Sequence, residues 1–210
     1  MSFGSPGPFS LRRGGCAAAS EAEAAYTGAV KSTSTVWLVG MMGAGKSTVG
    51  RKLAHQLRRR FVDTDHEIAR AAGCSVAEIF ASQGEGVFRR LELAAVKPLV
   101  GSGAVVALGG GAVAQAELRE ALDGSVVYLR AAPETLLSRV REAESRPLLA
   151  GLSADERLER LRGLLELREA AYGTAAITID TDLLAPSEVA ERVLGALQAA
   201  VPARAPGGLR

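Results

Sequence analysis

Short apolar segments alternate with longer amphipathic segments along most of this 210-residue chain. In one amphipathic segment, Val49, Leu53 and Leu57 recur every four residues with basic and polar side chains between them, which predicts a helix with one apolar face. The apolar segments are short and bounded by turn-forming or polar residues, so we predict strands at Val36–Gly40, Phe61–Asp63, Ala104–Leu108, Val126–Leu129 and Ala176–Asp180. Strands and helices that alternate in this way form an α/β fold, a parallel sheet covered by helices on both faces. Such sheets bind ligands at the carboxyl ends of their strands.

Local signals mark several helix ends. Two segments, Ser75–Glu78 and Ser153–Glu156, have the Ser-x-x-Glu spacing of a capping box. Pro133 suits the first position of a helix, and Gly173 suits the position after the last.

The two ends of the chain lack these patterns. Residues 1–33 are rich in small residues and proline without a helical apolar stripe, so we predict a disordered N-terminal tail, one folded domain over 34–200 and a second disordered tail over 201–210. No apolar core follows Arg12 and Arg13, so a secretory signal is not indicated and we expect a cytoplasmic protein. The alternative is a plastid protein with a transit peptide in 1–33, against which Glu21 and Glu23 count.

Composition and charge exclude several classes of protein. With 48% hydrophobic and 23% charged residues, the chain can bury a core and is neither fibrous nor wholly disordered. Five of the 25 basic residues but only two of the 23 acidic residues lie in the two tails, which leaves the body with a net charge of −1 and no basic surface for nucleic acid. The longest uncharged run, 98–116, contains five glycines and only a short continuous apolar part, so we expect a buried strand there and no membrane partner.

A phosphate-binding motif follows the first predicted strand. Residues 40–47 read Gly-Met-Met-Gly-Ala-Gly-Lys-Ser, which matches GxxxxGK[ST] between a strand and a helix. Glycines let backbone N–H groups converge on phosphate oxygens, Lys46 reaches the β- and γ-phosphates of ATP, and the Ser47 hydroxyl can ligate Mg²⁺. We therefore expect ATP to be bound by Gly43, Ala44, Gly45, Lys46, Ser47 and Thr48; the alternative is a glycine-rich turn before an ordinary helix.

Two carboxylates, Asp63 and Asp65, stand at the end of the second predicted strand. Alternate residues of an extended segment point the same way, so both can face the site. A kinase for a small alcohol needs one acid to hold Mg²⁺, directly or through water, and another to orient the acceptor hydroxyl. A solvated turn is the alternative, and the position after a P-loop strand favours the functional interpretation.

Two further features suggest a binding site with less specificity. Gly109–Gly111 follow the third predicted strand, where they form either a tight turn or a close backbone approach to a ligand. Arg89 and Glu92 lie three apart on a predicted helix and share a face, as in many surface ion pairs.

Taken together, these motifs resemble the shikimate kinase family. The likeness covers nearly the whole body and includes the P-loop, Phe-x-Asp-Thr-Asp at 61–65, Gly-Glu-x-x-Phe-Arg-x-x-Glu at 84–92, Gly-Gly-Gly-Ala-Val at 109–113, Arg-Pro-Leu-Leu at 146–149, and Arg168 four residues before Tyr172. The resemblance implies a P-loop NTPase fold of three layers, α/β/α, with a five-stranded parallel sheet in the order 2-3-1-4-5 and a mobile lid over about 142–155. It also implies transfer of the ATP γ-phosphoryl group to the 3-hydroxyl of shikimate, with Mg²⁺ as cofactor. Separately from the resemblance, we expect a monomer.

The resemblance also implies roles for particular residues. Catalysis would fall to Lys46, Asp65 and Arg146, with Asp65 meeting the acceptor hydroxyl and Arg146 closing over the phosphates from the lid. Asp63, with Ser47, would serve the Mg²⁺, and Arg139 would lie near the nucleotide. Shikimate would be held by Asp65, Arg89, Gly110, Gly111 and Arg168, with Glu92 orienting Arg89.

Two other functions stay open on the residues alone. One is a P-loop kinase for another carboxylated polyol such as gluconate, because two arginines aimed at a carboxylate do not separate these acids. The other is a nucleotide-binding module without catalysis, although such a module would be expected to lose Asp65 or one of the arginines.

Overall fold

A computed structural model describes residues 34–140 and 148–200. Its centre is a sheet of five parallel strands in the order β2-β3-β1-β4-β5. The strands are β1 (Val36–Val39), β2 (Phe61–Asp63), β3 (Val105–Ala107), β4 (Ser125–Arg130) and β5 (Ile177–Asp180). All five predicted strands are present, within two residues of their expected ends, and the strand order implied by the family resemblance is confirmed.

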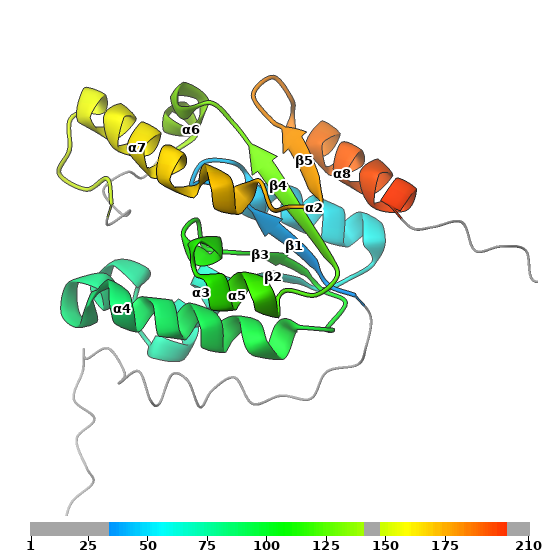
Figure 1. Ribbon diagram of the computed structural model, residues 1–210, viewed down its shortest axis with the longest axis horizontal. Coiled ribbons are helices and arrows are strands. Elements are labelled where there is room, and N and C mark those ends of the chain that lie inside the picture. The colour runs from blue at the N-terminus through cyan, green and yellow to red at the C-terminus, as the bar shows by residue number, and fades with distance from the viewer. Residues whose placement is uncertain (1–33, 141–147, 201–210) are drawn as a thin grey trace, which may run out of the picture.

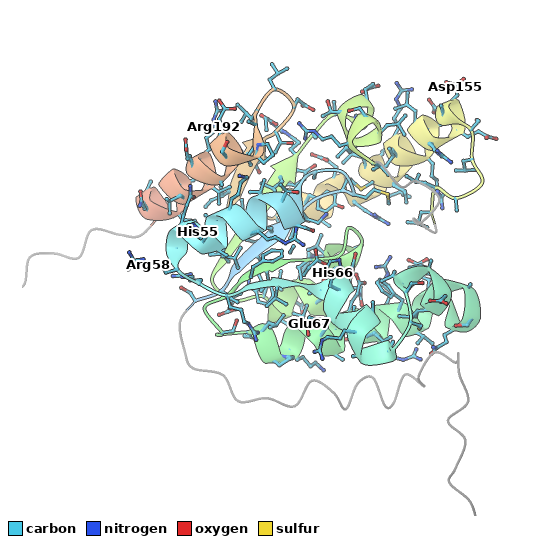
Figure 2. The ribbon with its side chains drawn as sticks, turned by 180° about the vertical axis from the view of Figure 1, so that it is seen from behind. His55, Arg58, His66, Glu67, Asp155 and Arg192 are labelled. Carbon is cyan, nitrogen blue, oxygen red and sulfur yellow. The ribbon has the colours of Figure 1, made fainter. Side chains whose placement is uncertain are left out.

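Helices cover both faces of the sheet (Figure 1). Figure 1 shows α5 and α7 in front of the strands, whereas Figure 2, from behind, shows α2 and α8. The helices are α2 (Lys46–Leu57), α3 (Thr64–Ala72), α4 (Val76–Val96), α5 (Ala116–Ala121), α6 (Pro133–Arg139), α7 (Ala154–Tyr172) and α8 (Pro186–Ala200), with short 3₁₀ helices η1 (Lys97–Leu99) and η2 (Ala112–Ala114). The expected α/β/α layers are therefore confirmed. Within the described ranges, no helix is long and apolar enough to cross a membrane.

The predicted helix ends correspond to real caps. The hydroxyls of Ser75 and Ser153 each accept a hydrogen bond from the backbone N–H of the glutamate three residues on, and the carboxylate of that glutamate accepts one from the serine backbone N–H. Pro133 begins α6, and α7 ends at Tyr172.

The centre of the sheet is fully buried. In β1, Trp37 and Leu38 have no exposed surface, and Trp37 pairs with Val106 of β3 on one side and Val126 of β4 on the other. Strands buried on both faces read as continuous apolar runs, which is why β1 and β3 stand out in the sequence. Because the strands are parallel, the segments that follow β1, β2 and β3 meet at one edge of the sheet.

A second, smaller apolar cluster lies beside the main core. Ile68 and Ala72 of α3 pack with Ile79, Phe88 and Leu91 of α4, apart from the core of the sheet. Helices α3 and α4 therefore form a packed unit of their own next to the carboxyl ends of β2 and β3.

Candidate active site

The loop between β1 and α2 has a backbone that only glycine adopts readily. Gly40, Gly43 and Gly45 have φ angles of 138°, 83° and 89°. A Cβ atom on Gly43 would lie 2.5 Å from the carbonyl oxygen of Leu136. Gly45 is the N-cap residue before α2 and supplies no side-chain cap, and no acidic residue lies in the first turn, so the helix N-terminus is suited to an anion.

This loop borders a large cavity of about 820 Å³. All six P-loop residues expected to bind ATP, 43–48, line it. The Lys46 ammonium group donates to the carbonyl oxygens of Gly40 (2.7 Å) and Met41 (2.9 Å). The lysine is therefore already folded back over the loop in which phosphates would lie.

Asp63 connects the P-loop to α3. Its Oδ2 accepts a hydrogen bond from the Ser47 hydroxyl at 2.5 Å, and its Oδ1 accepts the backbone N–H of Asp65 at 3.2 Å, which caps α3. The two acids face the same cavity, as expected, but the reason given from an extended segment is wrong. Asp63 ends β2 while Asp65 lies in the first turn of α3, so the helix start, and not strand alternation, brings Asp65 into the site.

Gly109–Gly111, the glycine segment, follows β3 and runs against the side chains of the site. A Cβ atom on Gly109 would lie closer than 3.0 Å to a carboxylate oxygen of both Asp65 and Glu92, and one on Gly111 would lie 2.5 Å from Arg89 Nη2. Their φ angles are not positive, so glycine is needed here for space and not for backbone conformation. The close approach expected from the sequence is thus first of all an approach to the protein's own charged groups.

Arg89 and Glu92 lie on α4 at the same place. Arg89 Nη1 donates to Glu92 Oε2 at 2.5 Å, and its Nη2 donates to Glu85 at 2.6 Å. Glu92 has only 1% of its side chain exposed and also accepts a hydrogen bond from Gln115 Nε2 at 3.1 Å. Burial raises the pKa of Glu92 to about 7, although Arg89 opposes this effect. A surface ion pair is therefore not the right description of Arg89 and Glu92.

Arg168 reaches the glycine segment from α7 on the other side. Its Nη1 donates to the carbonyl oxygen of Gly110 at 3.2 Å, and the Tyr172 hydroxyl donates to the same oxygen at 2.5 Å. Tyr172 is fully buried, and its ring stacks on that of Tyr128 at a centroid distance of 4.8 Å. The four-residue spacing of Arg168 and Tyr172 places both on one face of α7, toward Gly110.

These groups surround a second cavity of about 70 Å³. Arg89, Glu92, Arg168 and the glycine segment form its polar side, and its apolar side is lined by Val76, Phe80, Phe88 and Leu148. Met42, Asp65 and Gly110 line both the small and the large cavity, so the two spaces adjoin.

Arg139 lines the far end of the large cavity, with Thr181, Leu184, Pro186 and Val189. Its guanidinium donates to the hydroxyl of Thr181 (3.0 Å) and to the carbonyl oxygen of the same residue (2.6 Å).

Arg146 and residues 142–147 of the expected lid lie outside the described residues, as do the expected tails over 1–33 and 201–210. In the rest of the expected lid, Leu149 is buried and Ser153 caps α7.

Four residues of the site were not assigned a role from the sequence. Thr64 lies between the two acids, and its hydroxyl forms hydrogen bonds with the last residue of β3 and with the segment that follows β3. His66 lines the large cavity at the start of α3 (Figure 2). Gln115 donates a hydrogen bond to the Glu92 carboxylate, and Tyr172 donates one to the carbonyl oxygen of Gly110. A polar residue between two acids at a strand end could have indicated Thr64, whereas no local pattern indicates the contact of Gln115.

The parallel sheet in the order 2-3-1-4-5, with a P-loop between β1 and α2, defines a protein of the P-loop kinase fold. The family model described as shikimate kinase matches residues 42–198. The chain belongs to the shikimate kinase family.

Several relatives agree with this assignment. The chain is 45% identical to shikimate kinase of Bordetella pertussis over 168 residues, which are 78% of either protein. It is 44% identical to shikimate kinase of Thermus thermophilus over 163 residues, covering 76% of this chain and 87% of the relative. The solved structure of shikimate kinase from Acinetobacter baumannii in complex with shikimate is 37% identical, with a TM-score of 0.75, and the match covers 84% of this chain and 97% of that one.

Proposed function

We propose that this chain transfers the γ-phosphoryl group of ATP to the 3-hydroxyl of shikimate, giving shikimate 3-phosphate and ADP. The reaction is a step of the shikimate pathway to chorismate and the aromatic amino acids. Membership of the family supports this assignment, as does the likeness to a relative whose structure holds shikimate.

The observation that carries the proposal is the junction of the two cavities. Asp65 and Gly110 line both the large cavity beside the P-loop and the small cavity beside Arg89 and Arg168. An acceptor hydroxyl in the small cavity would therefore face a phosphoryl group in the large one. Phosphoryl transfer asks a protein mainly for such positioning and for stabilisation of charge.

ATP would lie in the large cavity. The N–H groups at the start of α2 would bind its phosphates, and Lys46 would turn from the Gly40 carbonyl oxygen to the β- and γ-phosphates. Arg139 would lie beside the nucleotide at the end of the cavity near Thr181. Arg146 keeps the role expected from the sequence, contact with the transferring phosphoryl group.

Shikimate would lie in the small cavity with its carboxylate toward Arg89 and Arg168. Guanidinium groups bind carboxylates with paired hydrogen bonds, and Glu92 holds Arg89 in place for this purpose. Gly110 and Gly111 would line the ring of the substrate, and Phe80 on the apolar wall would pack against it. Asp65 would accept the proton of the 3-hydroxyl and orient its oxygen for attack.

Ser47 and Asp63 fit a magnesium ion. Their hydroxyl and carboxylate oxygens lie 2.5 Å apart beside the P-loop, and Mg²⁺ is commonly held by one or two such protein oxygens together with phosphates and water. When bound, Mg²⁺ supplies charge that stabilises the β- and γ-phosphate oxygens. Asp63 would also keep its cap on α3, so the same carboxylate would fix the start of the helix that bears Asp65.

Coupled ADP release tests the function. With ATP and Mg²⁺, the parent protein should turn over shikimate and leave quinate and gluconate essentially untouched, while Lys46→Ala should lose turnover because the phosphates lose the P-loop cation. Turnover of gluconate in place of shikimate would point to a kinase for another polyol acid. Nucleotide binding without turnover of any acceptor would point to a non-catalytic module.

We keep the predictions of a cytoplasmic monomer, or a plastid protein if 1–33 is a transit peptide, without a nucleic-acid or membrane partner.

A further inference from the structure

A buried hydroxyl connects the acidic strand end to the glycine segment. Thr64 lies between Asp63 and Asp65 as the first residue of α3 and is 1% exposed. Its Oγ1 donates to the carbonyl oxygen of Ala107, the last residue of β3, at 3.3 Å, and it accepts the backbone N–H of Gly109 at 3.1 Å. One oxygen atom thus joins the start of α3 to both ends of the turn that leaves β3.

Helix formation does not account for these bonds. The side-chain cap of α3 comes from Asp63, whose Oδ1 accepts the N–H of Asp65. The Thr64 hydroxyl instead reaches residues more than 40 positions away in the sequence. Buried polar groups of this kind specify one arrangement of the segments that they connect, because moving either segment leaves a donor or acceptor without a partner.

The segment held by Thr64 contacts every charged group proposed to meet shikimate. Gly109 packs against the carboxylates of Asp65 and Glu92, and Gly111 packs against the guanidinium of Arg89. Gly110 accepts a hydrogen bond from Arg168. Three consecutive glycines have wide conformational freedom, so a tether at the first of them restricts a segment that would otherwise adopt many conformations.

We infer that Thr64 is a positioning residue for the acceptor substrate: its hydroxyl fixes the glycine segment against Asp65, Arg89 and Arg168 in the arrangement that binds shikimate. The inference rests on the proposed function. Thr64 touches neither ligand in this account, since it is absent from the lining of both cavities. Its effect should therefore appear in shikimate binding and turnover and spare nucleotide binding at the P-loop.

Thr64→Val tests this inference because valine keeps the shape and removes both hydrogen bonds. Direct titration should show shikimate binding weakened by about fivefold or more, with the affinity for a non-hydrolysable ATP analogue within about twofold of the parent. Thr64→Ser retains the hydroxyl, so its affinities for shikimate and for the ATP analogue should both stay within about twofold of the parent values. Thr35→Val is the matched control: Thr35 is also fully buried and donates to the Leu99 carbonyl oxygen, at the amino edge of the sheet. It should lower the melting temperature and leave both affinities unchanged.

Three results would overturn the inference. In the first, Thr64→Val matches Thr35→Val, with lower stability and unchanged shikimate affinity. In the second, Thr64→Val lowers the affinities for shikimate and for the ATP analogue equally. In the third, Thr64→Ser fails to restore shikimate binding. Should Thr64→Val not fold, amide exchange of Gly109 in the parent and in Thr64→Ser decides the matter. Slow exchange in both proteins supports the tether, and exchange as fast as that of an exposed amide refutes it. A parent that binds no shikimate would instead defeat the proposed function, and this inference with it.

Discussion

Asp65 is the one acidic residue among the three that line both cavities, and its charge is the property that the proposed reaction uses. Asp65→Asn keeps the shape of the side chain and removes the carboxylate that would accept the proton of the attacking hydroxyl. We expect kcat for shikimate phosphorylation to fall by about 10² or more, as for other positioned bases. The affinity for ATP, measured by titration, should change little.

Glu67→Gln provides the control on the same helix, because Glu67 is a partly exposed residue paired with the exposed Arg70. That variant should keep the parent kcat and melting temperature. If Asp65→Asn also stays within a few-fold of the parent, then Asp65 serves only to begin α3, and the proposed acceptor role fails.

Arg89 and Arg168 approach the small cavity from α4 and α7, so they should act on the same ligand. Arg89→Lys and Arg168→Lys retain a positive charge and lose the planar fork that pairs with a carboxylate. At such a partly desolvated site we expect shikimate binding to weaken by about 10- to 100-fold in each variant, with ATP binding nearly unchanged.

Arg90→Lys is the matched control, since Arg90 is the neighbour of Arg89 on α4 and donates to Gly86 of the same helix. Calorimetric titration of both ligands would separate the cases. Equal losses for shikimate and ATP in the Arg89 or Arg168 variant would contradict a carboxylate-binding role.

Single residues were predictable to the extent that a short motif contains them. The P-loop residues 43–48 follow from a strand, a glycine-rich loop and a lysine at fixed spacing. The partners that fix a site side chain are different, because Gln115 and Glu92 lie 23 positions apart and meet only through the packing of α4 near the start of α5. Glu85 was visible as part of a motif, and it lies four residues before Arg89 on α4, the helical spacing at which the two side chains form an ion pair.

At the scale of elements, the glycine segment shows how closely backbone and charge are packed. A methyl group on Gly111 would lie 2.5 to 2.9 Å from three atoms of the Arg89 guanidinium. Gly111→Ala should therefore displace Arg89 and raise the KM for shikimate by about tenfold or more, with a smaller change in the KM for ATP.

Gly163→Ala is the corresponding control in the interior of α7, where a Cβ atom would meet nothing within 4 Å. Alanine is favoured over glycine in helices by up to about 1 kcal/mol, so this variant should melt at a slightly higher temperature with unchanged kinetics. Unchanged shikimate kinetics in Gly111→Ala would show that Arg89 does not need its present position.

The strands were predictable from the sequence because each is short, apolar and closed by a turn-forming or polar residue, as Phe61–Asp63 illustrates. The end of β2 at Asp63 was predicted, but the start of α3 directly after it was not, because Thr64 and Asp65 were interpreted as a continued extended segment. The backbone of α3 begins at Thr64, and Asp63 Oδ1 caps this helix start. The triple glycine likewise indicated close contact, but its partners come from α3, α4 and α7 and depend on the tertiary fold.

At the scale of the molecule, the order of the strands was supplied by family resemblance. Periodicity gives the number and type of elements, whereas the order 2-3-1-4-5 depends on contacts between distant strands. The division of the apolar residues into two clusters also has no local signal. It places the α3–α4 unit, with Asp65, Arg89 and Glu92, beside the sheet and not within its core.

Burying Glu92 in this arrangement should make the stability of the whole molecule depend on pH. Burial raises the pKa of Glu92 from 4.5 to about 7, so the folded state holds a proton that the unfolded state releases. Stability from this source is complete below about pH 4.5 and is lost as the pH rises through about 7. In the Glu92→Gln variant the side chain at this position is uncharged at every pH, so the variant should not lose stability from this source as the pH rises.

The free energy of unfolding of Glu92→Gln relative to the parent should therefore rise by about 3 kcal/mol between pH 4.5 and 7.5, because the pKa of Glu92 is raised from 4.5 to about 7 on folding. Urea denaturation at several pH values measures this difference, and subtracting the parent curve removes the other titrating groups. Glu85→Gln, which removes the more exposed partner of Arg89, should show a much flatter difference because a solvated ion pair contributes little. A flat difference for Glu92→Gln would mean that Arg89 fully offsets the cost of burying the charge, and that the carboxylate stays ionised across the physiological range.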